Sequence, residues 1–197
     1  MSYTKAIALM NKGPSRPTLF EVRLPNRRIS RGTNEYLSFF CKATAIPEVR
    51  TNTVAVAGHE HMGIVREQAT NVMFGKPFTM TVIIDNDFTV YDELRSWFDD
   101  IAQNSNQDQR GFRTQRMNYS KTYVEDMQLI KYEQPERELS IGSILGFDTN
   151  EYKKVLTVNF INAFPIQISQ VTLNTETTNT VTEFNIDFTY ESYTLER

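Results

Sequence analysis

The chain has 197 residues, of which 40% are hydrophobic and 23% charged, so it is sized and composed for one globular domain and is not a disordered or membrane-type sequence. Its formal net charge of -3 argues against tight binding of nucleic acid, since such binding depends on clustered lysine and arginine side chains. One arginine-rich stretch, RLPNRRISRG, lacks interleaved aromatic residues and is interpreted as a solvated loop.

The N-terminal stretch MSYTKAIALMNKGPSRP contains neither the apolar core of a signal peptide nor a membrane-spanning run, so we expect a protein without a membrane anchor that is made in the cytoplasm. Cys41 is the single cysteine, which excludes an intrachain disulfide and fits a reducing compartment. Because Cys41 lies in an apolar run, we expect it to be a small core residue.

Two early segments predict an antiparallel pair of strands. The first, TLFEVRL, places Phe20, Val22 and Leu24 on one face, and the second, YLSFFCKA, follows a turn that contains Gly32. Further along, NTVAVAG and FTMTVII also have strand-like patterns.

The next segment predicts a strand end followed by the one convincing helix. Asp85 closes the strand, and Thr89 with Asp92 three residues later resembles a capping box. These acidic residues do not fit a calcium-binding loop, because Val90 stands where that loop needs glycine. The apolar stripe of the helix consists of Val90, Leu94, Trp97, Phe98 and Ile101.

The last third of the chain predicts three more strands. TYVEDMQLIKYE alternates imperfectly and indicates a bulge, and KVLTVNFIN is rich in β-branched residues. The strongest alternation lies near the end, where one face is apolar and the other polar and mostly acidic. The apolar face holds Phe184, Ile186, Phe188 and Tyr190, and the polar face holds Glu183, Asn185, Asp187 and Glu191.

Together these patterns predict a mainly β fold: a sandwich or barrel of two packed antiparallel sheets with one flanking α-helix and extended loops. We expect a single domain over residues 1–197, with loop or arm additions near 49–76, 104–121 and 133–152.

No pattern is typical of an enzyme. The HEH triplet at 59–61 lacks a third ligand, and Glu183 and Asp187 would lie about 13 Å apart along one strand, too far for a glycosidase pair. We therefore predict no catalytic residues, no metal and no cofactor.

Five segments, in this order, carry a resemblance to a known family: RPTLFEVRL, FFCKATAIP, FTMTVIIDND, YDELRSWFDDI and INAFPIQISQVTL. They resemble the tail tube protein of contractile-tailed, T4-like bacteriophages, most strongly over 16–47, 78–101 and 156–190. The additions at 104–121 and 133–152 depart from that family.

The resemblance implies a structural virion protein that forms hexameric rings, which stack into the inner tail tube inside a contractile sheath. Four strands of each subunit would join edge to edge around the channel, and double-stranded DNA would pass through transiently. Implied partners are further copies of the chain, the sheath, the baseplate and the tape-measure protein, and the implied location is the virion tail, after assembly in the host cytoplasm.

The same resemblance implies two sets of functional residues. The expected inter-ring interface consists of Val54, Val56, Met62, Ile64, Met73 and Phe74, and the expected lumen-facing residues are Glu183, Asn185, Asp187 and Glu191. Alternatives are a baseplate or tube-initiator protein of the same fold, a tube subunit of a related contractile injection system, and a small-ligand β-barrel binder.

Overall fold

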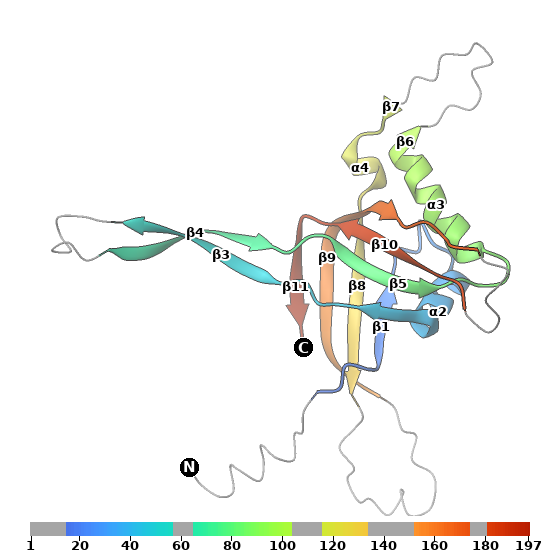
Figure 1. The fold of residues 1–197 in the computed structure, drawn as a ribbon, viewed down its shortest axis with the longest axis horizontal. Helices are drawn as coiled ribbons and strands as arrows, with labels where there is room; N and C mark the ends of the chain where they lie inside the picture. Colours follow the sequence, from blue (N-terminus) through green and yellow to red (C-terminus); the bar gives the residue numbers. More distant parts are fainter. Residues whose placement is uncertain (1–14, 57–64, 104–115, 134–151, 174–180) are drawn as a thin grey trace, which may run out of the picture.

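The computed structural model describes residues 15–56, 65–103, 116–133, 152–173 and 181–197. The body of the protein is built on two packed antiparallel sheets, as the sequence predicted (Figure 1). Sheet A contains β1 (Phe20–Arg23), β8 (Glu125–Glu133), the first part of β9 (Lys153–Ile168) and β11 (Ser192–Glu196). Sheet B contains the last part of β9, then β10 (Glu183–Thr189), β5 (Phe78–Ile83) and β2 (Cys41–Thr44).

Strand β9 and the β10–β11 segment pass together from one sheet to the other. Their pairing continues across the corner, because the N–H of Glu191 donates to the carbonyl of Ile161 at 3.0 Å. Asn162 turns β9 at this point with φ of 54°, a left-handed conformation that asparagine tolerates better than most residues. Its backbone N–H donates to Asp126 Oδ1 at 3.0 Å, and its side-chain amide donates to Glu191 Oε2 at 2.5 Å.

The core lies between the two sheets. The predicted apolar face of β10 is buried, and it meets apolar side chains from sheet A and from β5. Aromatic rings fill much of this space, as in the contact between Phe78 and Phe160, whose ring centroids lie 4.6 Å apart. The irregularity expected in β8 is confirmed by two register shifts along its pairing with β9.

Helix α3 (Thr89–Ile101) covers one end of this core, which confirms the predicted helix. Its Trp97 is 1% exposed, packs 5.8 Å from the ring of Phe188, and donates its indole N–H to the carbonyl of Tyr123 at 2.8 Å. Tyr123 ends the one-turn helix α4 (Ser120–Tyr123), and next to it β6 (Ala102–Gln103) pairs with β7 (Arg116–Met117).

The capping box expected at Thr89 is wrong. The residue at the N-cap position is Phe88, which has φ of 57° and whose side chain accepts no hydrogen bond from the helix. Instead, the Asp85 carboxylate reaches across the turn to the first helical N–H groups. Thr89 donates to it at 2.9 Å and Val90 at 3.2 Å. Burial alone would raise the pKa of Asp85, but these hydrogen bonds outweigh it and hold the pKa below its ordinary value.

The strand expected around YLSFFCKA is also wrong. Residues Arg31–Phe40 form helix α2, a second flanking helix, and strand structure begins only at Cys41. The Ser30 hydroxyl caps the helix by accepting from the N–H of Thr33 at 3.2 Å, and Thr33 and Leu37 are buried one turn apart. Capping and helical burial thus outweigh the strand preference of the aromatic residues, so β1 pairs with β8 instead.

A separate two-stranded ribbon projects far from the sandwich (Figure 1). It consists of β3 (Val49–Val56) and β4 (Arg66–Phe74), and we call it the arm. All of its residues except Val56 and Phe74 at the strand ends are exposed.

Candidate assembly surfaces

The outer face of sheet B is a continuous polar surface. On it, Thr79 Oγ1 donates to Asp187 Oδ1 at 2.6 Å, and Thr81 Oγ1 donates to Asn185 Oδ1 at 2.8 Å. Both bonds join residues that are directly opposite each other on β5 and β10. These cross-strand hydrogen bonds therefore fix the polar side chains of β5 and β10 in place on the surface of the sheet.

An ion pair extends this surface to β2. Lys42 Nζ donates to Glu183 Oε2 at 2.8 Å, so the positive charge of Lys42 offsets one of the carboxylates that the sequence suggested for this face. Three of the four expected lumen-facing residues, Glu183, Asn185 and Asp187, lie together here. Glu191 lies at the corner between the sheets and accepts from Asn162.

Sheet B has two free edges among the described residues. Strand β2 pairs only with β5, and the β9 segment from Phe164 to Ile168 pairs only with β10, because β8 leaves β9 at Ala163. Each neighbouring pair in sheet B is antiparallel, so the two edge strands run in opposite directions (Figure 1). Unpaired edges of this kind invite pairing with another chain.

The arm has two different faces. Val54 and Val56 share a face with Met73, because Met73 lies directly opposite Arg50 on the paired strand. Phe74 lies on the other face, opposite Val49, and its ring packs 5.1 Å from that of Tyr193 in the body of the protein. Of the expected inter-ring residues, Met62 and Ile64 lie outside the described residues.

Two tyrosines, Tyr190 between β10 and β11 and Tyr193 on β11, fix the base of the arm. The hydroxyl of Tyr190 donates to the carbonyl of Gly75, and that of Tyr193 donates to the carbonyl of Pro47 at 2.9 Å. Burial, followed by the neighbouring Tyr193, raises the pKa of Tyr190 to about 12, so its hydroxyl stays protonated in ordinary buffers. A Cβ at Gly75 would meet Glu48 Cγ at 2.5 Å, so a larger residue at this crossing would force the Glu48 side chain to move.

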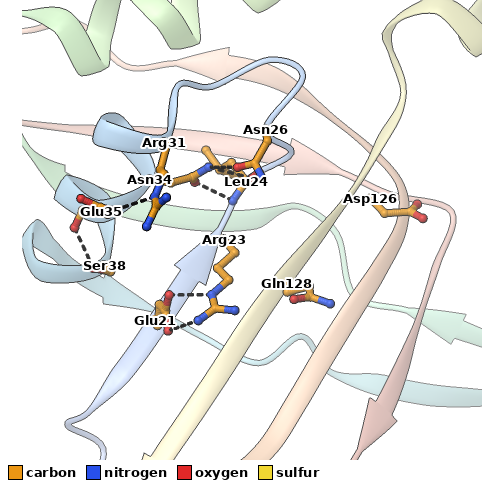
Figure 2. A pocket seen from close by; sticks show the side chains of 10 residues that line it. All are labelled: Glu21, Arg23, Leu24, Asn26, Arg31, Asn34, Glu35, Ser38, Asp126 and Gln128. Atoms are coloured by element: carbon orange, nitrogen blue, oxygen red, sulfur yellow. Dashed lines mark hydrogen bonds and ion pairs between the residues drawn. The ribbon is translucent and has the colours of Figure 1, made fainter.

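A polar groove runs between α2 and the β1–β8 part of sheet A (Figure 2). Its charged groups pair within the groove: Arg23 contacts Glu21 at 2.6 Å, and Arg31 contacts Glu35 at 3.0 Å. Since these charges are satisfied locally, the groove offers no concentrated charge to a ligand.

Within the described residues, the side chains do not assemble a metal or nucleophilic site. No group of three or more potential metal ligands occurs there, and the HEH triplet falls outside that part of the chain. Cys41 is 8% exposed, as the sequence predicted, and burial raises the pKa of its thiol to about 11. In the same residues, no helix has the length and hydropathy needed to span a bilayer.

A family model described as phage tail tube protein matches residues 15–196, so the chain belongs to the phage tail tube protein family. This confirms the resemblance seen in the sequence. The members of this family are tail tube proteins, which are structural components.

Several solved structures share the fold. A chain of the sheath–tube complex of the PVC extracellular contractile injection system in its extended state aligns with a TM-score of 0.56 at 12% identity, covering 100% of this chain and 99% of that one. A chain of the anti-feeding prophage baseplate aligns with a TM-score of 0.56 at 12% identity, covering 93% and 95%. A chain of the cap that terminates the anti-feeding prophage tube gives 0.54 at 10% identity, covering 93% and 91%. Curated protein sequences give no match.

Proposed function

We propose that six copies of the chain close a ring by pairing β2 of each subunit with the free end of β9 in the next, and that such rings stack into a tube. The two free, oppositely running edges of sheet B are the observation that carries this proposal. Rotation about a ring axis keeps all subunits in one orientation, so β2 would meet β9 in the antiparallel sense. The sheet would then close without any exposed edge.

Disulfide trapping tests this pairing. Ala43 on β2 and Ile166 on β9 are both exposed, so Ala43→Cys combined with Ile166→Cys, or with Gln167→Cys one register position away, should form covalent ladders that end at six subunits. The buried native Cys41 thiol will not compete, because its raised pKa keeps it protonated. Assembled tubes that yield no ladder with either cysteine pair would contradict the pairing of β2 with β9 between subunits, which we call the seam.

Electron microscopy of the wild-type protein at rising concentration, alone and with a baseplate, supplies the companion measurement. Hollow tubes of uniform width with a regular axial repeat are expected. A protein that stays monomeric under both conditions would contradict the ring and the stack together.

The polar outer face of sheet B would line the channel. Glu183, Asn185 and Asp187 would face the lumen there, with Glu191 near the end of the strand. Because the threonine hydroxyls and the Lys42 ammonium already donate to partners on this face, few donors remain free for DNA phosphates, and double-stranded DNA would pass without sticking. Replacing Glu183 and Asp187 by lysine should slow DNA ejection, and unchanged ejection kinetics in such virions would argue against a lumenal position.

The arm would contact the neighbouring ring through the face that carries Val54, Val56 and Met73, with Met62 and Ile64 assigned to the same interface by the resemblance. Phe74 would serve mainly to seat the arm on Tyr193. On the outside, the tube would contact the contractile sheath, with the baseplate and the tape-measure protein as further partners. The protein would assemble in the host cytoplasm and reside in the virion tail.

A tube subunit of a contractile injection system is the second candidate, because a solved structure with this fold belongs to such a system. A tube of this second kind would have the same ring, stack and sheath as a phage tail and would differ only in the material that passes through it. The material inside isolated particles, DNA or protein, separates the two functions.

A further inference from the structure

One large apolar side chain beside the β2 edge is mostly uncovered, and it borders an open groove with Phe20 and Tyr132 of its own chain. Phe39 is 83% exposed, although it lies only two residues before β2 begins. Its helical neighbours do not cover it, because Tyr36 and Phe40 stack on each other with ring centroids 4.3 Å apart. An aromatic ring held this far into solvent is typical of an interface residue.

The opposite edge of the same sheet carries a groove. It lies between α3 and the free end of β9 and has a volume of about 420 Å³. Tyr91 and Phe98 contribute its aromatic wall, while Ile166 and Ile168 contribute the strand side. Ile166 is 48% exposed, so this wall is apolar and uncovered.

Both features lie on the core side of sheet B. Helix α3 packs there through Tyr91, whose ring lies 5.6 Å from that of Phe184, and α2 contacts β5 and buries Leu37 in the same core. If β2 of one copy pairs antiparallel with β9 of the next, the Cys41 end of β2 meets the Ile168 end of β9. The ring of Phe39 then arrives directly beside the groove.

We infer that Phe39 of each subunit inserts into the α3–β9 groove of the next copy and locks the seam between them. This inference rests on the proposed ring and adds the side chain that fixes its lateral contact. The occupant of the groove is therefore a second copy of this chain.

The charges around the two features are mixed, because Asp99 lines the groove together with Arg95. Glu35 lies one helical turn before Phe39 on the same face of α2, and its carboxylate already pairs with Arg31 at 3.0 Å. Arg95 lines the groove, and its guanidinium makes no hydrogen bond or ion pair with other described residues. The apolar side chains, and not the charges, therefore carry the contact between Phe39 and the groove.

The first test compares Phe39→Ala with Leu195→Ala, a control that also removes an exposed apolar side chain but lies on β11 in sheet A. Sedimentation velocity gives the protein concentration at which half the subunits enter rings. We expect this concentration to rise at least about tenfold for Phe39→Ala and less than about twofold for the control. Equal behaviour of Phe39→Ala and wild type, with wild-type rings present, would overturn the lock while leaving the ring intact.

The second test traps the contact. Phe39→Cys with Arg95→Cys on one chain should give covalent ladders in assembled rings, whereas mixing the two single variants should stop at covalent dimers. An internal crosslink would run as a monomer and so would overturn the assignment. Wild-type protein that forms no ring at all would instead overturn the proposed function on which the lock depends.

Discussion

The sandwich and the arm are built on opposite principles. In the sandwich, the large side chains of β10 and α3 are buried against one another, and the polar groups outside pair on the surface. In the arm, nearly every residue of both strands is exposed. An isolated two-stranded ribbon is marginally stable in water, so the difference teaches that the body supplies its own stability and the arm depends on another surface.

The largest effect should follow from opening the core of the sandwich. Trp97→Ala removes a ring that packs on Phe188 and a hydrogen bond to Tyr123, and should lower the free energy of unfolding by about 3–5 kcal/mol. Urea denaturation followed by far-ultraviolet circular dichroism measures this, since the chain has no other tryptophan. Tyr119→Ala, at a position 88% exposed, is the control and should change stability by less than about 0.5 kcal/mol. Similar losses in both variants would show that the core is not where the stability resides.

A smaller loss should follow at the start of α3. Asp85→Ala removes the carboxylate that caps Thr89 and Val90 and should cost about 1 kcal/mol at pH 7, whereas Asp87→Ala in the same turn should cost much less.

The stabilisation that Asp85 provides should depend on pH. Because the folded pKa of Asp85 is depressed, its contribution is fully present above the unfolded pKa of about 3.9 and is lost as the pH falls through the folded value. The difference in denaturant midpoint between the wild type and Asp85→Ala should therefore become smaller as the pH is lowered from 7 to 3. A gap that widened on acidification would contradict the cap.

A substitution at the junction between the sandwich and the arm should lower stability by about as much as Asp85→Ala or by less. Tyr190→Phe removes the hydrogen bond to Gly75 and should cost about 0.5–1.5 kcal/mol. Hydrogen exchange should also become faster in the first residues of the arm. Tyr36→Phe is the matched control, since its hydroxyl makes no hydrogen bond to other described residues. Unchanged exchange in Tyr190→Phe would mean that the arm is not anchored through this hydroxyl.

The smallest effect on stability should come from the arm itself. Val54→Asp with Met73→Asp should change the free energy of unfolding of the soluble subunit by less than about 0.5 kcal/mol, because both side chains are exposed. The same change should abolish tubes in electron micrographs by charging the proposed contact face. Thr51→Asp charges the opposite face and should leave tubes intact. Tubes of normal length in the double variant would place the inter-ring contact elsewhere.

The predictable parts of the fold are those where one face of an element is buried locally. The alternation from Phe184 to Tyr190 and the stripe from Val90 to Ile101 each report a single buried face, so both elements could be predicted from the sequence. Helix α2 could not, because the aromatic cluster at its end favours strands. The Ser30 cap and the spacing of Thr33 and Leu37 were the available signal.

The candidate surfaces were only partly accessible from the sequence. The polar face of β10 was predicted, but the Lys42–Glu183 ion pair joins residues 141 positions apart, and only the folded sheet brings them together. The two faces of the arm were hidden for a similar reason. A register shift between Asn52 and Thr53 changes which residues lie opposite each other, and the pattern of β4 alone does not reveal it.

The corner at Asn162 has a mechanical consequence. Because β9 and the β10–β11 segment run through both sheets, the two sheets are joined by covalent chain as well as by packing. One sheet therefore cannot slide along the other without breaking the paired corner. In the proposed tube, a wall made of such subunits would bend and transmit load as a single shell, so the channel would stay straight and open if a sheath around it shortened.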